Sequence, residues 1–211
     1  MVLDISGYTL RIKNNLLLDH AHLHFQPGSV NHIVGKNGVG KSRLAKDFIL
    51  NKSGFFPKQL SSNLTVISSY SNIPEDISAK LLFKILIKRY DRMMLDQLSD
   101  LLNIENIPSN ILIKNLSDGQ KQKLKLVSFL LENKEIIILD EITNSLDKKT
   151  VNEIHQFLNI YSKQHSNKII LNITHNLSDL KNIEGRYFLF QDKKLVQYED
   201  KDQLIKIYIE D

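Results

Sequence analysis

The sequence predicts an α/β fold built around a mainly parallel central sheet, and three observations support this prediction. Short, predominantly apolar runs at residues 136–139 and 169–173 are typical of strands buried on both faces. These runs alternate with segments of helical periodicity, which is the pattern of a parallel sheet connected by helices. The 211 residues, 42% of them apolar, are enough for one good core with a small subdomain attached.

The first third of the chain predicts strands. Residues 3–12 mix β-branched, aromatic and apolar side chains, and residues 20–25 alternate between histidines and apolar side chains. We therefore expect an N-terminal antiparallel β subdomain beside the parallel core. A short apolar strand, a helix and a further strand should follow, at residues 30–34, 43–50 and 64–67.

A helical segment should interrupt the sheet. Residues 76–103 carry leucine and isoleucine at helical spacing, and Pro108 with neighbouring asparagines ends that pattern. We assign 73–116 to an inserted helical subdomain and 1–72 with 117–211 to the core, all within one domain. The apolar stripe is the packing face of this subdomain, or in part an edge that docks a partner. The elements expected after it are a helix at 120–132, a strand at 136–139, a helix at 148–163, a strand at 169–173, a hairpin at 187–196 and a terminal helix at 200–211.

The composition excludes several classes of function. The chain has no cysteine, so disulfide frameworks, cysteine-ligated zinc, iron–sulfur clusters and thiol catalysis are excluded. The formal net charge is +4 with the lysines spread along the chain, and we therefore expect no nucleic-acid partner. No apolar run approaches the ~18–20 residues of a membrane-spanning helix, and Asp4 interrupts any export signal. Attachment to a membrane would therefore need a partner.

A glycine-rich loop carries the first chemical signal. Residues 35–42 match G-x-x-x-x-G-K-[ST], with an apolar strand before the loop and a helix after it. Glycines let successive N–H groups surround a phosphate, and the following helix adds its positive dipole end. Lys41 would reach the β- and γ-phosphates, and the Ser42 hydroxyl would ligate Mg²⁺. The predicted nucleotide-binding residues are Gly35, Lys36, Asn37, Gly38, Val39, Gly40, Lys41, Ser42 and Arg43.

An acidic pair follows one of the apolar strands. Residues 136–139 deliver Asp140 and Glu141 to the C-terminal end of that strand, where ligands bind in an open α/β sheet. Asp140 would hold the Mg²⁺ shell, and Glu141 would polarise an attacking water as general base. Taken alone, the pair could equally be an acidic turn, and the phosphate loop upstream argues against that alternative.

Three further motifs complete an ordered set. The segment 116–120, L-S-D-G-Q before a basic helix, resembles the L-S-G-G-Q signature of ATP-binding cassette (ABC) ATPases. The segment 145–147, S-L-D, resembles the D-loop of that family through Asp147, and His175 resembles its switch histidine. The five motifs have the order and spacing of the family and cover nearly the whole chain.

This resemblance implies a head-to-tail dimer, with a second identical or different ABC subunit, in which two ATP molecules lie between the subunits. The signature of each subunit would bind the ATP of its partner through Ser117, Asp118, Gly119 and Gln120. His175 would contact the γ-phosphate and the attacking water. Glu141, His175 and Lys41 are thus the implied catalytic residues, and Ser42 and Asp140 the ligands of Mg²⁺, for in-line hydrolysis of the γ-phosphate.

The resemblance also implies a cellular role. A single cassette without membrane spans suggests the ATP-hydrolysing subunit of a transporter, held at the cytoplasmic face of the membrane by an integral membrane permease. Export is slightly favoured over import, and the transported substrate is not encoded in this chain. A soluble ABC ATPase of an assembly machine is the alternative. A nucleotide-binding regulator with little hydrolysis is a third reading, which the intact catalytic residues disfavour.

Several positions depart from the family pattern. Asp118 replaces a signature glycine, a change that is tolerated if the carboxylate points away from phosphate. Ile12 stands where an aromatic residue usually stacks on adenine, with Tyr8 nearby but out of register, so we expect loose base selectivity. Members of the family have a glutamine after the strand near residue 70, and its side-chain oxygen ligates Mg²⁺. This chain has no glutamine there, so Ser71 or Asn72 would have to supply the oxygen.

One group of residues suggests a metal, although we favour a simpler interpretation. Three histidines alternate along one expected strand, and a fourth could lie on a neighbouring strand: His20, His22, His24 and His32. Such spacing could bind a metal ion. The opposite face of the strand is apolar, however, so a solvated polar face is the interpretation that we favour.

Overall fold

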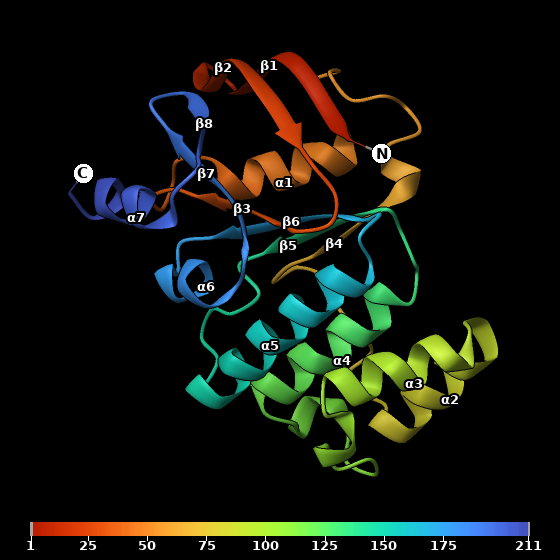
Figure 1. Ribbon diagram of the computed structural model, residues 1–211. Coiled ribbons are helices and arrows are strands. Elements are labelled where there is room, and N and C mark those ends of the chain that lie inside the picture. Colours follow the sequence, from red (N-terminus) through yellow and green to blue (C-terminus); the bar gives the residue numbers. More distant parts are fainter. Residues whose placement is uncertain (1, 211) are drawn as a thin grey trace.

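The computed structural model describes residues 2–210 and confirms an α/β fold with a mainly parallel sheet (Figure 1). The main sheet has six strands in the order β4-β5-β6-β3-β7-β8, and only the edge strand β8 is antiparallel to its neighbour. Every residue of β5 and β6 is buried, which explains their apolar sequences. The strands are β3 (Val30–Val34), β4 (Leu64–Ile67), β5 (Ile136–Asp140), β6 (Ile169–Thr174), β7 (Gly185–Gln191) and β8 (Lys194–Tyr198).

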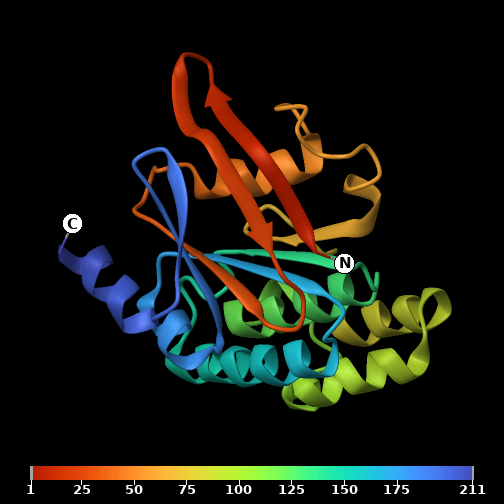
Figure 2. The same ribbon diagram turned by 45° about the horizontal axis from the view of Figure 1, so that its top comes forward.

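The N-terminal strands form the expected antiparallel subdomain. β1 (Leu3–Ile12) and β2 (Asn15–Phe25) make a separate two-stranded sheet, and β2 begins earlier than the alternation at 20–25 predicts. Figures 1 and 2 show α1 (Lys41–Leu50) between this hairpin and the main sheet. Leu23 and Phe25 are fully buried on the side of the hairpin that packs over the core. This packing holds the hairpin above the loop that precedes α1.

Helices cover the other face of the main sheet (Figure 1). The segment expected to be mostly helical at 76–103 contains two helices, and the Asp91 side chain caps the second by accepting a hydrogen bond from the Met94 N–H (2.8 Å). The helices that follow α1 are α2 (Ala79–Arg89), α3 (Arg92–Leu101), α4 (Asp118–Leu130), α5 (Lys148–Gln164), α6 (Leu177–Asn182) and α7 (Lys201–Glu210). The 3₁₀ turns are η1 (Ser61–Asn63), η2 (Ile104–Asn106) and η3 (Ile113–Asn115).

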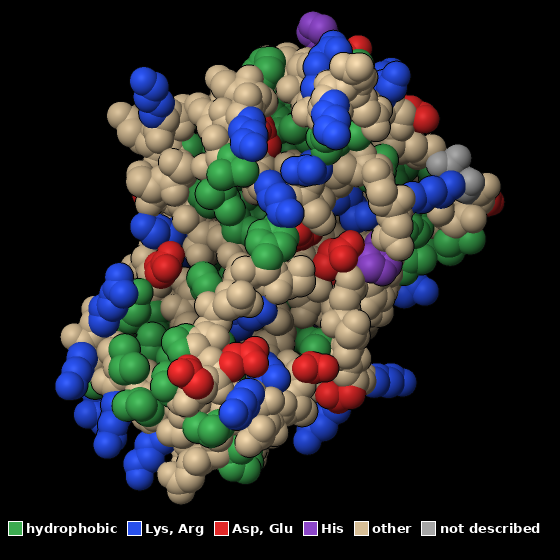
Figure 3. All heavy atoms as spheres, turned by 180° about the vertical axis from the view of Figure 1, so that it is seen from behind, with side chains coloured by type: hydrophobic (Ala, Val, Ile, Leu, Met, Phe, Trp, Pro, Cys, Tyr) green, Lys and Arg blue, Asp and Glu red, His purple; other side chains and the backbone are tan. Residues whose placement is uncertain are grey.

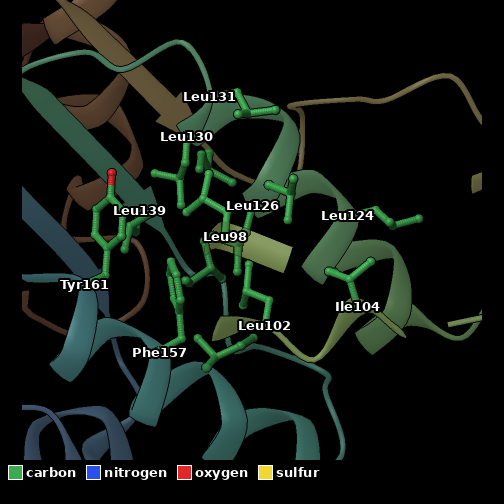
Figure 4. Close-up of a cluster of buried hydrophobic side chains, with 14 of the residues drawn as sticks. Leu98, Leu102, Ile104, Leu124, Leu126, Leu130, Leu131, Leu139, Phe157 and Tyr161 are labelled. Carbon is green, nitrogen blue, oxygen red and sulfur yellow. The ribbon is translucent and has the colours of Figure 1, made fainter. Parts of the chain in front are cut away.

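The apolar stripe of α2 and α3 divides between a buried and an exposed side. Leu98 of α3 is buried in the same cluster as Leu126 of α4 and Phe157 of α5 (Figure 4). Leu81 and Ile85 of α2 instead remain 45% and 47% exposed. The stripe is therefore partly a packing face and partly a surface. No helix within residues 2–210 is long and apolar enough to cross a membrane.

The expectation that His32 could neighbour the exposed histidines is wrong. His32 lies in β3, at the centre of the main sheet rather than on the hairpin, and is fully buried. Its ring stacks on Tyr187, with 5.5 Å between the ring centroids. Burial lowers the pKa of this imidazole to about 4. His32 is therefore a neutral core residue, and alternation in a short segment could not reveal this.

Candidate nucleotide site

The glycine-rich loop connects β3 to α1 at the C-terminal edge of the sheet. Gly40 has φ +121°, a backbone conformation that L side chains rarely adopt, and a Cβ there would lie 2.9 Å from Leu17. The buried Lys41 ammonium donates hydrogen bonds to the Gly35 carbonyl (2.6 Å) and the Lys36 carbonyl (3.1 Å). The loop is therefore wrapped around a positive charge at the start of a helix, which is the arrangement that favours phosphate.

Negative charge lies directly beside this loop. Asp140 ends β5, is 4% exposed, and accepts a hydrogen bond from the Ser42 hydroxyl (3.2 Å). Burial raises the pKa of Asp140, whereas the hydrogen bond from Ser42 opposes the rise. Burial also lowers the pKa of Lys41, an effect that the charges of Glu141 and Asp140 oppose. A hydroxyl and a carboxylate held side by side fit Mg²⁺, which prefers a few oxygen ligands and keeps several waters.

Tyr70 is a residue of the site that the sequence did not indicate. Its hydroxyl donates to the second oxygen of Asp140 (3.3 Å), and the Lys46 ammonium lies 4.5 Å from its ring centroid. Ser71 points back to its own turn, where its hydroxyl donates to the Val66 carbonyl (2.8 Å). Asn72 lines the same cavity as Tyr70. In a stretch without a motif, only the fold could show which side chain reaches the carboxylate.

Glu141 and His175 form a pair next to the loop. The Glu141 carboxylate lies 3.1 Å from His175 Nδ1 and accepts a hydrogen bond from the Asn144 amide (2.9 Å). Glu141 has φ +57°, which is uncommon outside glycine, and its N–H is bonded to the Ile173 carbonyl (2.9 Å). This constrained backbone holds a half-exposed carboxylate between the ends of β5 and β6.

The structure therefore brings together five of the residues singled out in the sequence: Lys41, Ser42, Asp140, Glu141 and His175. A cleft of about 370 Å³ beside them is lined by residues of the glycine-rich loop and by Ile12, Asn15 and Leu17 of the hairpin. Among residues 2–210, no aromatic side chain lines this cleft. Tyr8 is fully buried beneath the hairpin and donates its hydroxyl hydrogen to Asp47 (2.8 Å), so it is not available to the cleft.

The signature segment lies at the start of α4, away from the loop. Ser117 caps this helix and forms a reciprocal pair of hydrogen bonds with Gln120 (3.3 and 3.0 Å). Two cavities are lined by both Ser42 and Glu141, and of the signature only the exposed Asp118 lines one of them. Within the part of the chain that the structure describes, the signature therefore does not complete the site beside Lys41.

The signature and the D-loop are in contact through the first turns of two helices. Asp147 caps α5 and accepts hydrogen bonds from the Thr150 N–H (2.9 Å) and hydroxyl (2.7 Å). A Cβ on Gly119 would lie only 2.5 Å from the Thr150 hydroxyl oxygen. The glycine thus allows α4 to approach α5 closely, which is a packing role that the motif alone does not reveal.

Replacing Gly119 by alanine is expected to lower the free energy of unfolding by about 1–3 kcal/mol, because the added methyl overlaps Thr150. Urea denaturation of Gly119→Ala, Thr150→Ala and the double variant would measure this. Thr150→Ala alone loses a hydrogen bond to Asp147, at a cost of about 1 kcal/mol. The double variant should be less destabilised than the sum of the two. Strictly additive effects would show that the contact does not limit the packing.

A glycine-rich loop between a strand and a helix, next to an acidic strand end, is the arrangement of the P-loop nucleoside triphosphatases. Comparison with known proteins narrows this class. The profile of the family described as "ABC transporter" matches residues 18–144. A Bacillus subtilis (strain 168) protein named "Probable peptide export ATP-binding protein YydI" is 57% identical over 98% of this chain and 99% of its own length. The chain therefore belongs to the ATP-binding proteins of ABC transporters, which are ATPases.

Solved structures agree on the fold. A chain described as "Structure of ATP binding subunit of ABC transporter" matches with a TM-score of 0.78 and 17% identity, covering 100% of this chain and 99% of that one. A chain from "Structure of a bacterial Atm1-family ABC exporter with ATP bound" matches with a TM-score of 0.76 and 18% identity. This match covers 98% of the present chain and 40% of the exporter chain.

Proposed function

We propose that this chain binds Mg²⁺ and ATP, hydrolyses the ATP, and thereby powers export through a separate membrane subunit. The observation that carries the proposal is the convergence of the phosphate loop, the buried Asp140 and the Glu141–His175 pair at one edge of the sheet. The relative named as a probable peptide export protein supports export over import and suggests a peptide as the exported substrate.

In this proposal each residue has a role at the phosphate end of the nucleotide. The loop N–H groups and Lys41 would hold the phosphates, while Ser42 and Asp140 would hold the metal ion, which would neutralise phosphate charge. Glu141 accepts the proton of the attacking water. His175, held by its hydrogen bond to Glu141, contacts the γ-phosphate through its other ring nitrogen.

A second ABC subunit, identical or different, would complete the site. Of the signature residues, Ser117 and Asp118 are exposed and can face another subunit, whereas Gly119 is buried at the start of α4. The Asp147 carboxylate is committed to capping α5, so it would act at the interface by fixing the position of that helix. The roles of Ser117, Asp118, Gly119 and Gln120 toward the ATP of the partner are part of the same proposal.

The membrane subunit would hold the chain at the cytoplasmic face of the membrane. The segment 73–116, which we propose as the helical subdomain, offers a surface for it: Leu81, Ile85 and Ile87 of α2 are each more than 40% exposed. Figure 3 shows hydrophobic side chains with lysines or arginines beside them over this end of the molecule. Such a mixed surface suits contact with another protein close to anionic lipid.

Co-purification tests the transporter role. The tagged chain is produced in its native cells, and detergent-solubilised complexes are isolated through the tag and searched for a multi-span membrane protein. We expect a stable complex whose ATPase activity exceeds that of the chain alone. Capture of a soluble scaffold, with no membrane protein, would favour the alternative of an assembly ATPase.

GTP is expected to compete with ATP within about tenfold, because the cleft lacks an aromatic face and so loses a stacking contribution of about 1 kcal/mol. Competition titration against a fluorescent ATP analogue measures this ratio. In the Ile12→Tyr variant, which returns an aromatic ring to the cleft, ATP should bind about five times more tightly. A strict preference of the wild-type chain for adenine would contradict this prediction.

A further inference from the structure

The β1–β2 hairpin carries a cluster of side chains that the nucleotide site does not use. Asp4 of β1 lies directly opposite His24 of β2 in the antiparallel register, and His22 is two residues away on the same face. The two oxygens of Asp4 lie 2.9 Å from His22 Nε2 and 2.6 Å from His24 Nδ1. One potential ligand atom from each of these three residues lies within 4.8 Å of the other two.

We propose that Asp4, His22 and His24 form a binding site for a divalent transition-metal ion such as Zn²⁺. Two imidazoles and a carboxylate are a donor set that such ions accept, and a fourth position is left for water. With metal–ligand bonds of about 2.0–2.1 Å, tetrahedral ligands lie about 3.4 Å apart. The His22 and His24 nitrogens, each of which contacts a different oxygen of Asp4, would therefore have to move away from those oxygens by less than about 1 Å.

The strands hold these ligands in place before any ion arrives. Because His22 and His24 are separated by one residue in a strand, both imidazoles leave the same face, and their ring centroids lie 5.8 Å apart. The side chains of His22, His24 and Asp4 are 57%, 34% and 49% exposed, so an ion can enter directly from solvent.

Gln26 supports His24 from the second side of its ring. The Gln26 amide nitrogen lies 3.0 Å from His24 Nε2, the nitrogen that does not face Asp4. With an ion on Nδ1, Nε2 carries the proton and donates to Gln26 after the amide turns over, so that its oxygen accepts. Such outer hydrogen bonds fix the tautomer and orientation of a metal-binding histidine.

His20 lies on the same strand as His22 and His24 but does not belong to the proposed metal site. Its φ of +47° breaks the regular alternation, and its ring pairs with the adjacent Asp19 at 2.9 Å. His20 is therefore outside the cluster and serves as a matched control. The cluster also lies at the opposite end of the hairpin from Ile12 and Asn15, which line the nucleotide cleft. Metal binding should therefore be separable from nucleotide binding.

Isothermal titration of the full chain with ZnCl₂, in a non-coordinating buffer with excess MgCl₂, tests the proposal. We expect one saturable site that is lost in the His22→Ala/His24→Ala double variant and retained in His20→Ala. Asp4→Asn and Gln26→Ala should each weaken binding at least about tenfold. Circular dichroism and ATP binding of each variant show whether the fold is kept. No saturable binding by the wild type would overturn the proposal. So would binding that survives in a folded double variant, since zinc would then be held elsewhere, for example by His175 and Glu141.

Discussion

Glu141→Gln is expected to slow ATP hydrolysis at least about 100-fold while leaving ATP binding close to that of the wild type. Glutamine has the shape of glutamate and keeps an oxygen for the Asn144 amide. It has no carboxylate with which to take a proton from water, so the variant lacks the general base but keeps the ATP-binding site. Initial rates of phosphate release give the kcat, and equilibrium titration with ATP gives the affinity.

The same variant should also accumulate as an ATP-bound dimer, because ATP that is bound by both subunits and is not hydrolysed would keep the two subunits together. Size-exclusion chromatography with and without Mg²⁺ and ATP measures this. Glu135→Gln is the matched control, since Glu135 immediately precedes the opposite end of β5 and is exposed. Its kcat should equal that of the wild type. If Glu141→Gln turns over normally and stays monomeric, Glu141 is not the general base.

The parts of the fold that the sequence predicts well are those governed by local pattern. The strands β5 and β6 are buried on both faces, and a strand in that position requires consecutive apolar residues. The phosphate loop is equally local, because a run of backbone N–H groups around an anion requires glycines at fixed spacing. Contacts between residues that are distant in the chain produce no local sequence pattern of this kind. Tyr70 meets Asp140 across 70 positions, and Asp4 meets His24 only because of the hairpin register.

The burial of polar residues in the core is also difficult to predict from the sequence. His32 interrupts an apolar strand, and its sequence neighbours do not tell whether it is exposed or, as the structure has it, fully buried against Tyr187. Asp179 is a second case, on a short helix that resembles an exposed turn, although it is only 1% exposed. In both cases the environment is set by elements that come from distant parts of the chain.

Asp179 connects the two segments that carry the proposed catalytic pair. Its carboxylate accepts hydrogen bonds from the Thr143 hydroxyl (2.9 Å) and the Thr174 hydroxyl (2.7 Å), and it lies 2.8 Å from His155 Nε2. Thr143 follows Glu141 by two residues, and Thr174 directly precedes His175. Burial alone would raise the pKa of Asp179, but the three hydrogen bonds outweigh it and lower the pKa. The group is therefore a buried anion that is bonded to both of the segments that carry Glu141 and His175.

Asp179→Ala is expected to lower the free energy of unfolding by about 3–5 kcal/mol, because His155 and two hydroxyls lose their acceptor in the core. Asp179→Asn keeps the volume and one acceptor oxygen and should lose less. Urea denaturation measures both. Since Asp179→Ala is the variant most prone to misfolding, Thr143→Val and Thr174→Val, each expected to cost about 1–2 kcal/mol, complete the series.

Activity separates a positioning role from simple stability. If Asp179 sets the spacing of Glu141 and His175, the folded threonine variants should show a lower kcat with an almost unchanged affinity for ATP. The matched controls are variants of similar stability cost far from both segments, such as Ile104→Val in the buried cluster that also holds Leu98, with an expected cost of about 0.5–1.5 kcal/mol. A kcat that follows stability equally in both sets would leave Asp179 with a structural role only. A decrease in kcat that is confined to the threonine variants would mean that Asp179 positions the Glu141–His175 pair, although its carboxylate does not itself line the nucleotide cleft.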